Sequence, residues 1–229
     1  EKKEKKKDDY ETNGIIGEKE IEKLKKAGEI SRQVKILARK ITKPGVTLFE
    51  IAEKLEAKMV ELGGKPAFPT NLSINEIAAH STPTFNDEAK ANGLLKIDIG
   101  VQVDGFVADT AFSLDLENNE ENKKLIEAAE LALKKGVETI SLKSKLMEIG
   151  AAIENSIKSF GFQPIINLSG HSIDQYSLHA GVTIPNYNNS QEYVPEIGVY
   201  AIEPFATSGV GRIRDGRPSG IYRIEREGN

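Results

Sequence analysis

The sequence predicts an α+β protein in which two helix pairs cover antiparallel strands. Helical periodicity comes in two early segments, residues 18–42 and 47–62, and in two later ones, residues 122–138 and 144–157. Short apolar runs broken by turn-forming residues lie between and after these pairs, as strands and hairpins require. This alternation indicates separate layers of helix and sheet. The repeated helix-helix-strand order is also compatible with a distant internal duplication.

The first predicted helix has one continuous apolar face. Its members recur every three or four positions and are Ile21, Leu24, Ala27, Ile30, Val34, Leu37 and Ile41. Pro44-Gly45 ends this helix. Thr47 followed by Glu50 predicts a capping box that opens the second helix, which Gly63-Gly64 ends.

The later elements are predicted by the same signals. Ser144 is the expected N-cap of the fourth helix, which ends before Phe160-Gly161. Strands are expected at residues 94–99 and 106–114 around a turn at Asp104-Gly105, and at residues 198–202. The last of these strands leads directly into Glu203.

Composition excludes several classes of function. The net charge of -4 and the pI near 5.6 provide no broad basic surface, so we expect no specific nucleic-acid partner. The chain has no cysteine, which excludes disulfides, zinc-thiolate sites and thiol nucleophiles. Any bound metal must therefore have oxygen and nitrogen ligands.

The chain is expected to be a cytoplasmic protein without membrane contact. No apolar run approaches the roughly 20 residues that cross a bilayer, and residues 1–9 are charged where a signal peptide would be apolar. Residues 1–13, EKKEKKKDDYETN, lack core-forming side chains and are expected to form a solvated tail. A tail that contacts the ribosome or RNA is the alternative.

Two aspartates in KIDIGVQVDGFVADTAFS are the first candidate metal ligands. Asp98 and Asp109 lie on the two strands of the predicted hairpin, and their midpoint falls between Val103 and Asp104. A symmetric hairpin turning around Val103-Asp104 would set the two carboxylates nearly opposite, with Cβ atoms about 5 Å apart. An isolated pair would more often face solvent. Here the flanking residues are apolar, and like charges so close are destabilising unless a cation separates them. A pair of divalent ions bridged by a carboxylate would resolve the conflict.

The chain has only three histidines, and all lie in segments punctuated by small residues. His80 is in NEIAAHSTP, while His171 and His179 are in NLSGHSIDQYSLHAG. A lone histidine is usually a satisfied polar residue, but three without spares favour a functional site. His171 and His179 are eight positions apart, so an extended segment would place both on one face.

Glu203 in VYAIEPFATSG completes the candidate ligand set. A glutamate at the end of a strand is ordinarily a surface residue, but Ala201, Ile202 and Phe205 around it favour burial. Carboxylate oxygens with imidazole nitrogen suit Mn, Fe(II), Co or Zn. The P-loop, H-E-x-x-H, G-x-S-x-G and dinucleotide-binding motifs are absent, and no nucleophile elbow surrounds Ser169.

Four segments together resemble the type 2 methionine aminopeptidases, which are metallopeptidases of the pita-bread fold. They are AFPTNLSINEIAAHSTP, KIDIGVQVDGFVADTAFS, NLSGHSIDQYSLHAGVTIPN and VYAIEPFATSG, in the family's order and spacing, and in compactness the chain resembles the archaeal type. The resemblance runs from about Glu18 to Tyr222. It implies a curved antiparallel sheet covered by two helix pairs, within a domain at residues 14–229.

The resemblance also implies the reaction and the cofactor. The family removes the initiator methionine from nascent proteins, by attack of a hydroxide that bridges two divalent metal ions on the first peptide bond. Co, Mn, Fe(II) and Zn are all compatible with the ligands. The expected partners are N-terminal methionyl peptides and nascent chains, with the ribosome nearby, and the enzyme is expected to be a monomer.

Site residues follow from the resemblance by position. Asp98 would bind one metal ion, Asp109 would bridge both, and His171 and Glu203 would complete much of the ligand set. His80 resembles a substrate-contacting histidine, and His179 resembles the histidine that donates to the scissile carbonyl. The methionine side-chain pocket would be lined by Phe68, Leu178 and Phe205.

The sequence departs from the family pattern at its C-terminal end. The family has a second bridging glutamate on a later strand, after the helical insertion that marks type 2, and neither is found before Asn229. We therefore expect an incomplete domain that lacks this insertion and the last strands. The second bridging ligand has no candidate in the sequence.

Three other readings remain open from the sequence. A relative that kept the fold as a binding module for ribosomes, RNA or proteins would usually lose metal ligands, whereas this chain retains the candidates and is acidic. A proline dipeptidase or aminopeptidase P would use a similar ligand set on the same fold. A purely structural role for the polar cluster would predict no metal binding above background.

Overall fold

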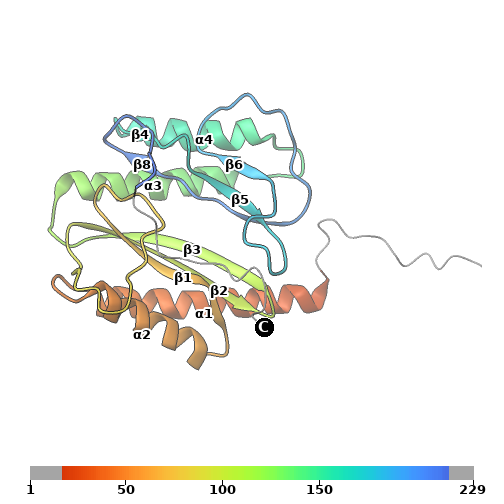
Figure 1. Cartoon of the computed structure of the whole chain (residues 1–229). Coiled ribbons are helices and arrows are strands. Elements are labelled where there is room, and N and C mark those ends of the chain that lie inside the picture. Colours follow the sequence, from red (N-terminus) through yellow and green to blue (C-terminus); the bar gives the residue numbers. More distant parts are fainter. Residues whose placement is uncertain (1–16, 217–229) are drawn as a thin grey trace, which may run out of the picture.

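The computed structural model describes residues 17–216. The predicted tail at residues 1–13 lies outside the described residues, so its boundary with the domain at residues 14–229 stays a prediction. Two helix pairs enclose the strands: α1 and α2 lie on one side of the molecule, and α3 and α4 lie on the other (Figure 1). The layered α+β architecture expected from the sequence is therefore present.

The first half contains two helices and one antiparallel sheet. Helices α1 (Glu18–Ile41) and α2 (Leu48–Glu61) precede strands β1 (Lys65–Ile74), β2 (Leu94–Val103) and β3 (Phe106–Asp115), which pair in the order β1-β2-β3. Helix α1 packs on β2 and β3, and α2 packs on β1. The sequence predicted both helices and the β2–β3 hairpin but missed β1.

The core of this half forms because strand β2 alternates. Leu95, Ile97, Ile99 and Val101 are fully buried against the helix pair, in one cluster with Ile51 of α2. Successive side chains of a strand point to opposite faces, so the residues between them face away from the helices. The opposite face of the sheet, which carries Asp98, is thus not covered by α1 and α2.

A two-residue turn fixes the register of the hairpin. Asp104 and Gly105 have φ angles of 50° and 82°, the left-handed pair that a tight hairpin turn requires. The turn pairs Val103 with Phe106, and the antiparallel register then extends without a shift to Leu94 and Asp115. The turn sequence Asp-Gly therefore sets the position of every side chain along both strands.

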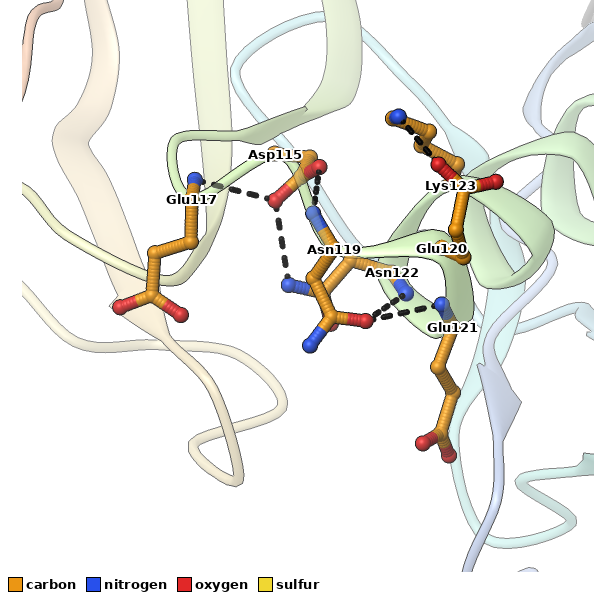
Figure 2. Close-up of polar contacts among 7 residues, drawn as sticks. All are labelled: Asp115, Glu117, Asn119, Glu120, Glu121, Asn122 and Lys123. Carbon is orange, nitrogen blue, oxygen red and sulfur yellow. Dashed lines mark hydrogen bonds and ion pairs between the residues drawn. The ribbon is translucent and has the colours of Figure 1, made fainter.

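Polar groups at the end of β3 start the next helix (Figure 2). The Asp115 carboxylate accepts hydrogen bonds from the backbone N–H groups of Glu117 and Asn119, at 3.1 and 2.7 Å. The Asn119 side chain in turn accepts from the N–H groups of Glu121 and Asn122, which satisfies donors of the first helical turn. This N-cap explains why α3 (Glu120–Thr139) begins where it does.

The second half repeats the helix pair but has shorter strands. Helix α3 packs on α4 (Leu146–Ser159), and five strands follow: β4 (Gln163–Pro164), β5 (Ser169–Ile173), β6 (Thr183–Pro185), β7 (Val199–Ala201) and β8 (Ala206–Thr207). Within the described residues these strands form two sheets, ordered β6-β5-β7 and β4-β8. The sequence predicted the helices and β7 but none of the other four strands.

The expected N-cap of α4 was wrong. Lys145 is the N-cap, and the Glu148 side chain caps the helix by accepting a hydrogen bond from the Lys145 N–H at 2.8 Å. The Ser144 hydroxyl instead donates to the carbonyl of Thr139 and so closes the loop between the helices. Ser144 is a loop residue because its hydroxyl bonds to the carbonyl of Thr139, earlier in the chain, and not to the first turn of α4.

None of the helices in the described part of the chain, residues 17–216, combines the length and apolarity that a membrane span requires.

Two helical glycines provide a matched test of the packing. Gly150 lies on α4 against the carbonyl of Tyr187, so a Cβ there would collide with backbone, whereas Gly28 on α1 has open space around it. Gly28→Ala should stabilise the chain by about 0.5–1 kcal/mol, because alanine loses less backbone entropy in a helix. Gly150→Ala should destabilise it despite the same propensity gain. Urea unfolding of both variants checks this, and equal shifts would contradict the close packing of α4.

Candidate metal centre

The two predicted aspartates lie on the same face of the hairpin, though not opposite one another. Asp98 pairs with Ala111, and Asp109 pairs with Gly100. The expectation of carboxylates nearly opposite each other was wrong, because the turn is centred between Asp104 and Gly105 rather than between Val103 and Asp104. The aspartates are diagonal neighbours, whose Cβ atoms lie at roughly 7–8 Å in an ideal ladder. That spacing leaves room for a cation between the carboxylates.

Three candidate ligands from three different elements meet on this face. Asp109 comes from β3, His171 from β5, and Glu203 from the segment after β7. One ligand atom from each lies within 4.8 Å of the others. His171 Nε2 is 3.5 Å from Asp109 Oδ2 and 2.9 Å from Glu203 Oε1. The fold thus brings together residues that are up to 94 positions apart.

The orientation of His171 suits a metal ligand. Its Nδ1 lies 3.3 Å from the Ser172 carbonyl, to which it can donate, and this tautomer leaves the Nε2 lone pair facing the carboxylates. Glu203 Oε1 is buried and lies 2.9 Å from Nε2. Without a metal ion, a proton on Nε2 satisfies this contact. When Nε2 is unprotonated, the lone pairs of three ligands face one another, and a divalent cation between them would resolve the repulsion.

The electrostatics of the ion-free cluster agree with that geometry. Burial, followed by the nearby Asp109 and Glu203, raises the pKa of Asp98 from 3.8 to about 7. Burial lowers the pKa of His171, but hydrogen bonding and charge from the two carboxylates outweigh it and raise the value to about 10. Both shifts mean that the cluster binds protons where a metal ion would otherwise supply positive charge.

The other two histidines lie beside the ligand cluster. The rings of His171 and His179 stack edge to face, with centroids 4.3 Å apart. Burial first, and then the charge of His171, lowers the pKa of His179 below its ordinary value of 6.5, and His80 contributes to the same shift. His80 is exposed and has a φ of 60°, a left-handed conformation that non-glycine residues seldom adopt.

The expected single extended segment from His171 to His179 was wrong. Eight extended residues would separate the two side chains by roughly 26 Å. Strand β5 ends at Ile173, and a backbone bridge between Asp174 and Ser177 turns the chain back on itself. The two imidazoles meet because of this turn.

Two of the three predicted pocket residues have contacts near the ligand cluster. The Phe68 ring covers Gly100, the residue paired with Asp109, so closely that a Cβ at Gly100 would collide with it. Leu178 packs against the cluster of Val107, Ile173 and Ala201. Phe205 is half-buried, and its carbonyl accepts a hydrogen bond from Ile165, which anchors the segment after Glu203.

Comparison with known proteins identifies the family of this fold and site. The model of metallopeptidase family M24 matches residues 22–228. The chain belongs to metallopeptidase family M24. It is 48% identical over 212 residues to a methionine aminopeptidase of Pyrococcus horikoshii, an alignment that covers 91% of this chain and 71% of that protein.

Solved structures bear out the predicted pita-bread fold. A methionine aminopeptidase from Thermotoga maritima has a TM-score of 0.81 at 28% identity, covering 89% of this chain and 86% of that one. The prolidase from Pyrococcus furiosus has a TM-score of 0.70 at 26% identity, covering 83% of this chain and 57% of that one. Membership of this metallopeptidase family implies use of a divalent metal ion. The Asp109, His171 and Glu203 cluster is the candidate position for that ion in this M24 peptidase.

Sequence reasoning missed three residues that support the M24 site. The Asn71 amide lies 3.5 Å from Asp98 Oδ2, and its oxygen is within 3.2 Å of the Thr82 hydroxyl. A Cβ at Gly170 would collide with the carbonyl of Ala201, so this glycine lets β5 and β7 approach. Asn71 lies on β1, in the segment that the sequence analysis assigned to substrate contact, and its polar side chain is buried. Among the described residues we assign no counterpart to the family's second bridging glutamate.

Metal ions should stabilise the M24 chain through this cluster. Addition of Mn²⁺ or Co²⁺ after chelator treatment should raise the Tm of the wild-type chain, because binding to the folded state alone shifts the unfolding equilibrium. Asp109→Asn should remove the Tm increase, while Asp215→Asn, an exposed aspartate far along the chain, should retain it. Thermal denaturation with and without EDTA checks this. An equal rise in all three proteins would place the ion elsewhere.

The raised pKa of Asp98 predicts a pH dependence of the metal-free chain. Its folded pKa of about 7 exceeds the unfolded value of 3.8, so the folded state holds the proton more tightly. Stability should therefore fall as pH rises from about 4 to about 7. Asp98→Asn should remove this loss, and the comparison is urea unfolding of both proteins in EDTA at pH 4, 5, 6 and 7. Parallel curves for the two proteins would contradict the raised pKa.

Proposed function

We propose that this chain is a metal-dependent aminopeptidase of the type 2 methionine class, which removes the N-terminal methionine of peptides and nascent proteins. The observation that carries the proposal is the convergence of Asp109, His171 and Glu203, with His179 stacked beside them. The 48% identity to the P. horikoshii methionine aminopeptidase supports the substrate. The higher TM-score and coverage for the T. maritima methionine aminopeptidase, 0.81 and 86% of that chain against 0.70 and 57% for the P. furiosus prolidase, favour methionyl over prolyl substrates.

The proposed cofactor is a pair of divalent ions, with Co, Mn, Fe(II) and Zn all compatible with the ligand chemistry. Asp109 would bind both ions and Asp98 would bind one of them. His171 and Glu203 would complete the ligand set that this chain provides. When bound, the ions would supply Lewis acidity and an acidified water. The hairpin holds Asp98 and Asp109 on one rigid pair of strands, so their separation is set before any ion binds.

His179 is the proposed donor to the scissile carbonyl. Its lowered pKa keeps the ring neutral near pH 7, so one ring N–H is available to donate to an oxygen that becomes negative in the tetrahedral state. The stacked His171 fixes the plane in which that donor lies. His80, close enough to lower the pKa of His179, is the proposed contact to the substrate backbone.

Apolar side chains beside the cluster are proposed to bind the methionine side chain. Phe68 is held over Gly100 and Leu178 is held on the Val107 cluster, so both are fixed close to the ligand residues. Phe205 follows Glu203 by two positions and is the proposed third wall. The carboxylates next to this pocket would attract the free α-amino group of a substrate, which favours cleavage at the first peptide bond.

The physiological context is part of the proposal. An initiator methionine is exposed as a chain leaves the ribosome, so we propose a cytoplasmic enzyme that acts near ribosomes, as a monomer. The net charge of -4 suits attraction of a cationic chain terminus.

The test is release of methionine from a Met-Ala-Ser peptide by the metal-loaded chain. Asp109→Ala should abolish release, because it removes the shared ligand. His179→Gln should lower kcat on the order of 100-fold, as loss of one donor to a developing oxyanion does elsewhere, and should leave Mn²⁺ binding in place.

An Xaa-Pro dipeptide is the control substrate, and preferential cleavage of it would replace the proposal with a prolidase. Tight Mn²⁺ binding without cleavage of either peptide, under conditions in which the chain is folded, would favour the binding-module reading.

A further inference from the structure

The segment that carries Leu178 and His179 is a closed loop. We call residues 174–180 the His179 loop. Asp174 and Ser177 exchange two backbone hydrogen bonds of 2.9 Å, which close a tight turn around Gln175 and Tyr176. At the end of the loop the Ala180 N–H donates to the carbonyl of Ser172 at 2.8 Å. The base of the loop is therefore attached to β5, next to His171.

The tip of the His179 loop is attached to a different element, the turn of the β2–β3 hairpin. The Tyr176 N–H donates to the Gly105 carbonyl at 2.9 Å, and Gln175 Nε2 donates to the Asp104 carbonyl at 2.9 Å. The Tyr176 ring lies against Gly105, so that a Cβ built there would stand 2.6 Å from two ring carbons. The loop after β5 reaches toward the tip of this hairpin (Figure 1).

The backbone at both contact residues is unusual. Tyr176 has a φ of 57°, a left-handed conformation that a large side chain rarely adopts. Such conformations persist only where surrounding contacts over-determine them, and they cluster at functional sites. Gly105 has a φ of 82° and is buried under the ring, so the position needs glycine for both its backbone and its missing side chain.

The hairpin connects this contact to the ligand carboxylates. The register is continuous from the turn to the pairs that contain Asp98 and Asp109. Helix α1 also contacts the turn, because Lys23 Nζ lies 3.3 Å from the Asp104 carboxylate. One rigid ladder thus carries the carboxylates along its length and the His179 loop at its tip.

We propose that Gly105 and Tyr176 are positioning residues that hold His179 at a fixed place relative to the metal-ligating aspartates. The proposal rests on the proposed function for the role of His179, while the geometry it asserts is independent of that function. Neither residue touches the reacting atoms. Their effect on the reaction is transmitted through the loop.

Matched glycine substitutions separate positioning from backbone strain. Gly105→Ala introduces a Cβ that displaces the Tyr176 ring at a φ of 82°. Gly161→Ala introduces the same group at a φ of 83°, at the end of α4, with nothing within 4 Å of the new Cβ. The φ angles are nearly the same in both variants, and only at Gly105 does the new Cβ meet the His179 loop.

Substitutions at Tyr176 test the same contact from the loop side. Tyr176→Ala removes the ring that lies on Gly105. Tyr176→Phe keeps the ring and should restore the behaviour that Tyr176→Ala loses. This pair also decides the question if Gly105→Ala does not fold.

Two readouts are needed, and the first does not depend on activity. The chain has three histidines, so imidazole ¹H–¹³C NMR spectra of the full chain contain three sets of signals, which His179→Gln assigns. Gly105→Ala and Tyr176→Ala should shift the His179 signals most, with smaller changes for its neighbours His171 and His80. Gly161→Ala and Tyr176→Phe should leave all three sets in place.

The second readout is the split between catalysis and metal binding. In the loop-displacing variants, kcat/KM for Met-Ala-Ser should fall on the order of 10- to 100-fold, because small misplacements of a catalytic group have effects of that size. Mn²⁺ affinity by calorimetry should stay within about two-fold of wild type, because the ligand residues keep their positions. Loss of catalysis together with loss of Mn²⁺ binding would indicate general disruption of the site and would overturn the proposal.

The outcomes distinguish this proposal from the proposed function. Unchanged His179 signals in both Gly105→Ala and Tyr176→Ala would overturn the positioning role, whatever the activity. Shifted His179 signals in both variants, together with a wild-type chain that releases no methionine, would support the loop geometry and reject the proposed function.

Discussion

The structure depends on one electrostatic constraint, the presence of several carboxylates and an imidazole lone pair on a single partly buried face. Asp109, Glu203 and His171 approach within contact distance, and Asp98 lies beside them. In water such groups would separate or take up protons; here the sheets hold them together. Each of the neighbouring features, from the Ser172 carbonyl to the Asn71 amide, serves to orient a ligand in a site that calls for a cation.

The β2–β3 hairpin is the rigid part of this arrangement. Its inward residues, such as Ile97 and Ile99, are fully buried against α1 and α2, so the hairpin cannot shift without opening the core. The outward residues therefore keep a fixed spacing. The short strands of the second half then bring His171 and Glu203 to this fixed surface, through the pairing of β5 with β7.

The local signals of the sequence were sufficient for the helices and for the hairpin. Apolar periodicity located all four helices within a few residues, because an amphipathic face is written in the local spacing of side chains. Strands β4, β6 and β8 of the second half were missed because they have two or three residues each, too few to show a period, and β5 (SGHSI) was missed because Ile173 is its only apolar residue. The register error at Asp98 was avoidable from the sequence, because an Asp104-Gly105 turn by itself fixes which residues pair.

The sequence by itself determined the chemistry of the site: the residue types, the order of the four motifs, the exclusion of thiolate ligands and the family to which the chain belongs. Only the tertiary structure decided which donors share one face and which group orients each of them. His179 reaches His171 through a turn and a contact with a hairpin about 70 residues earlier in the chain. Such contacts depend on the packing of distant segments, and neither local propensity nor side-chain period encodes them.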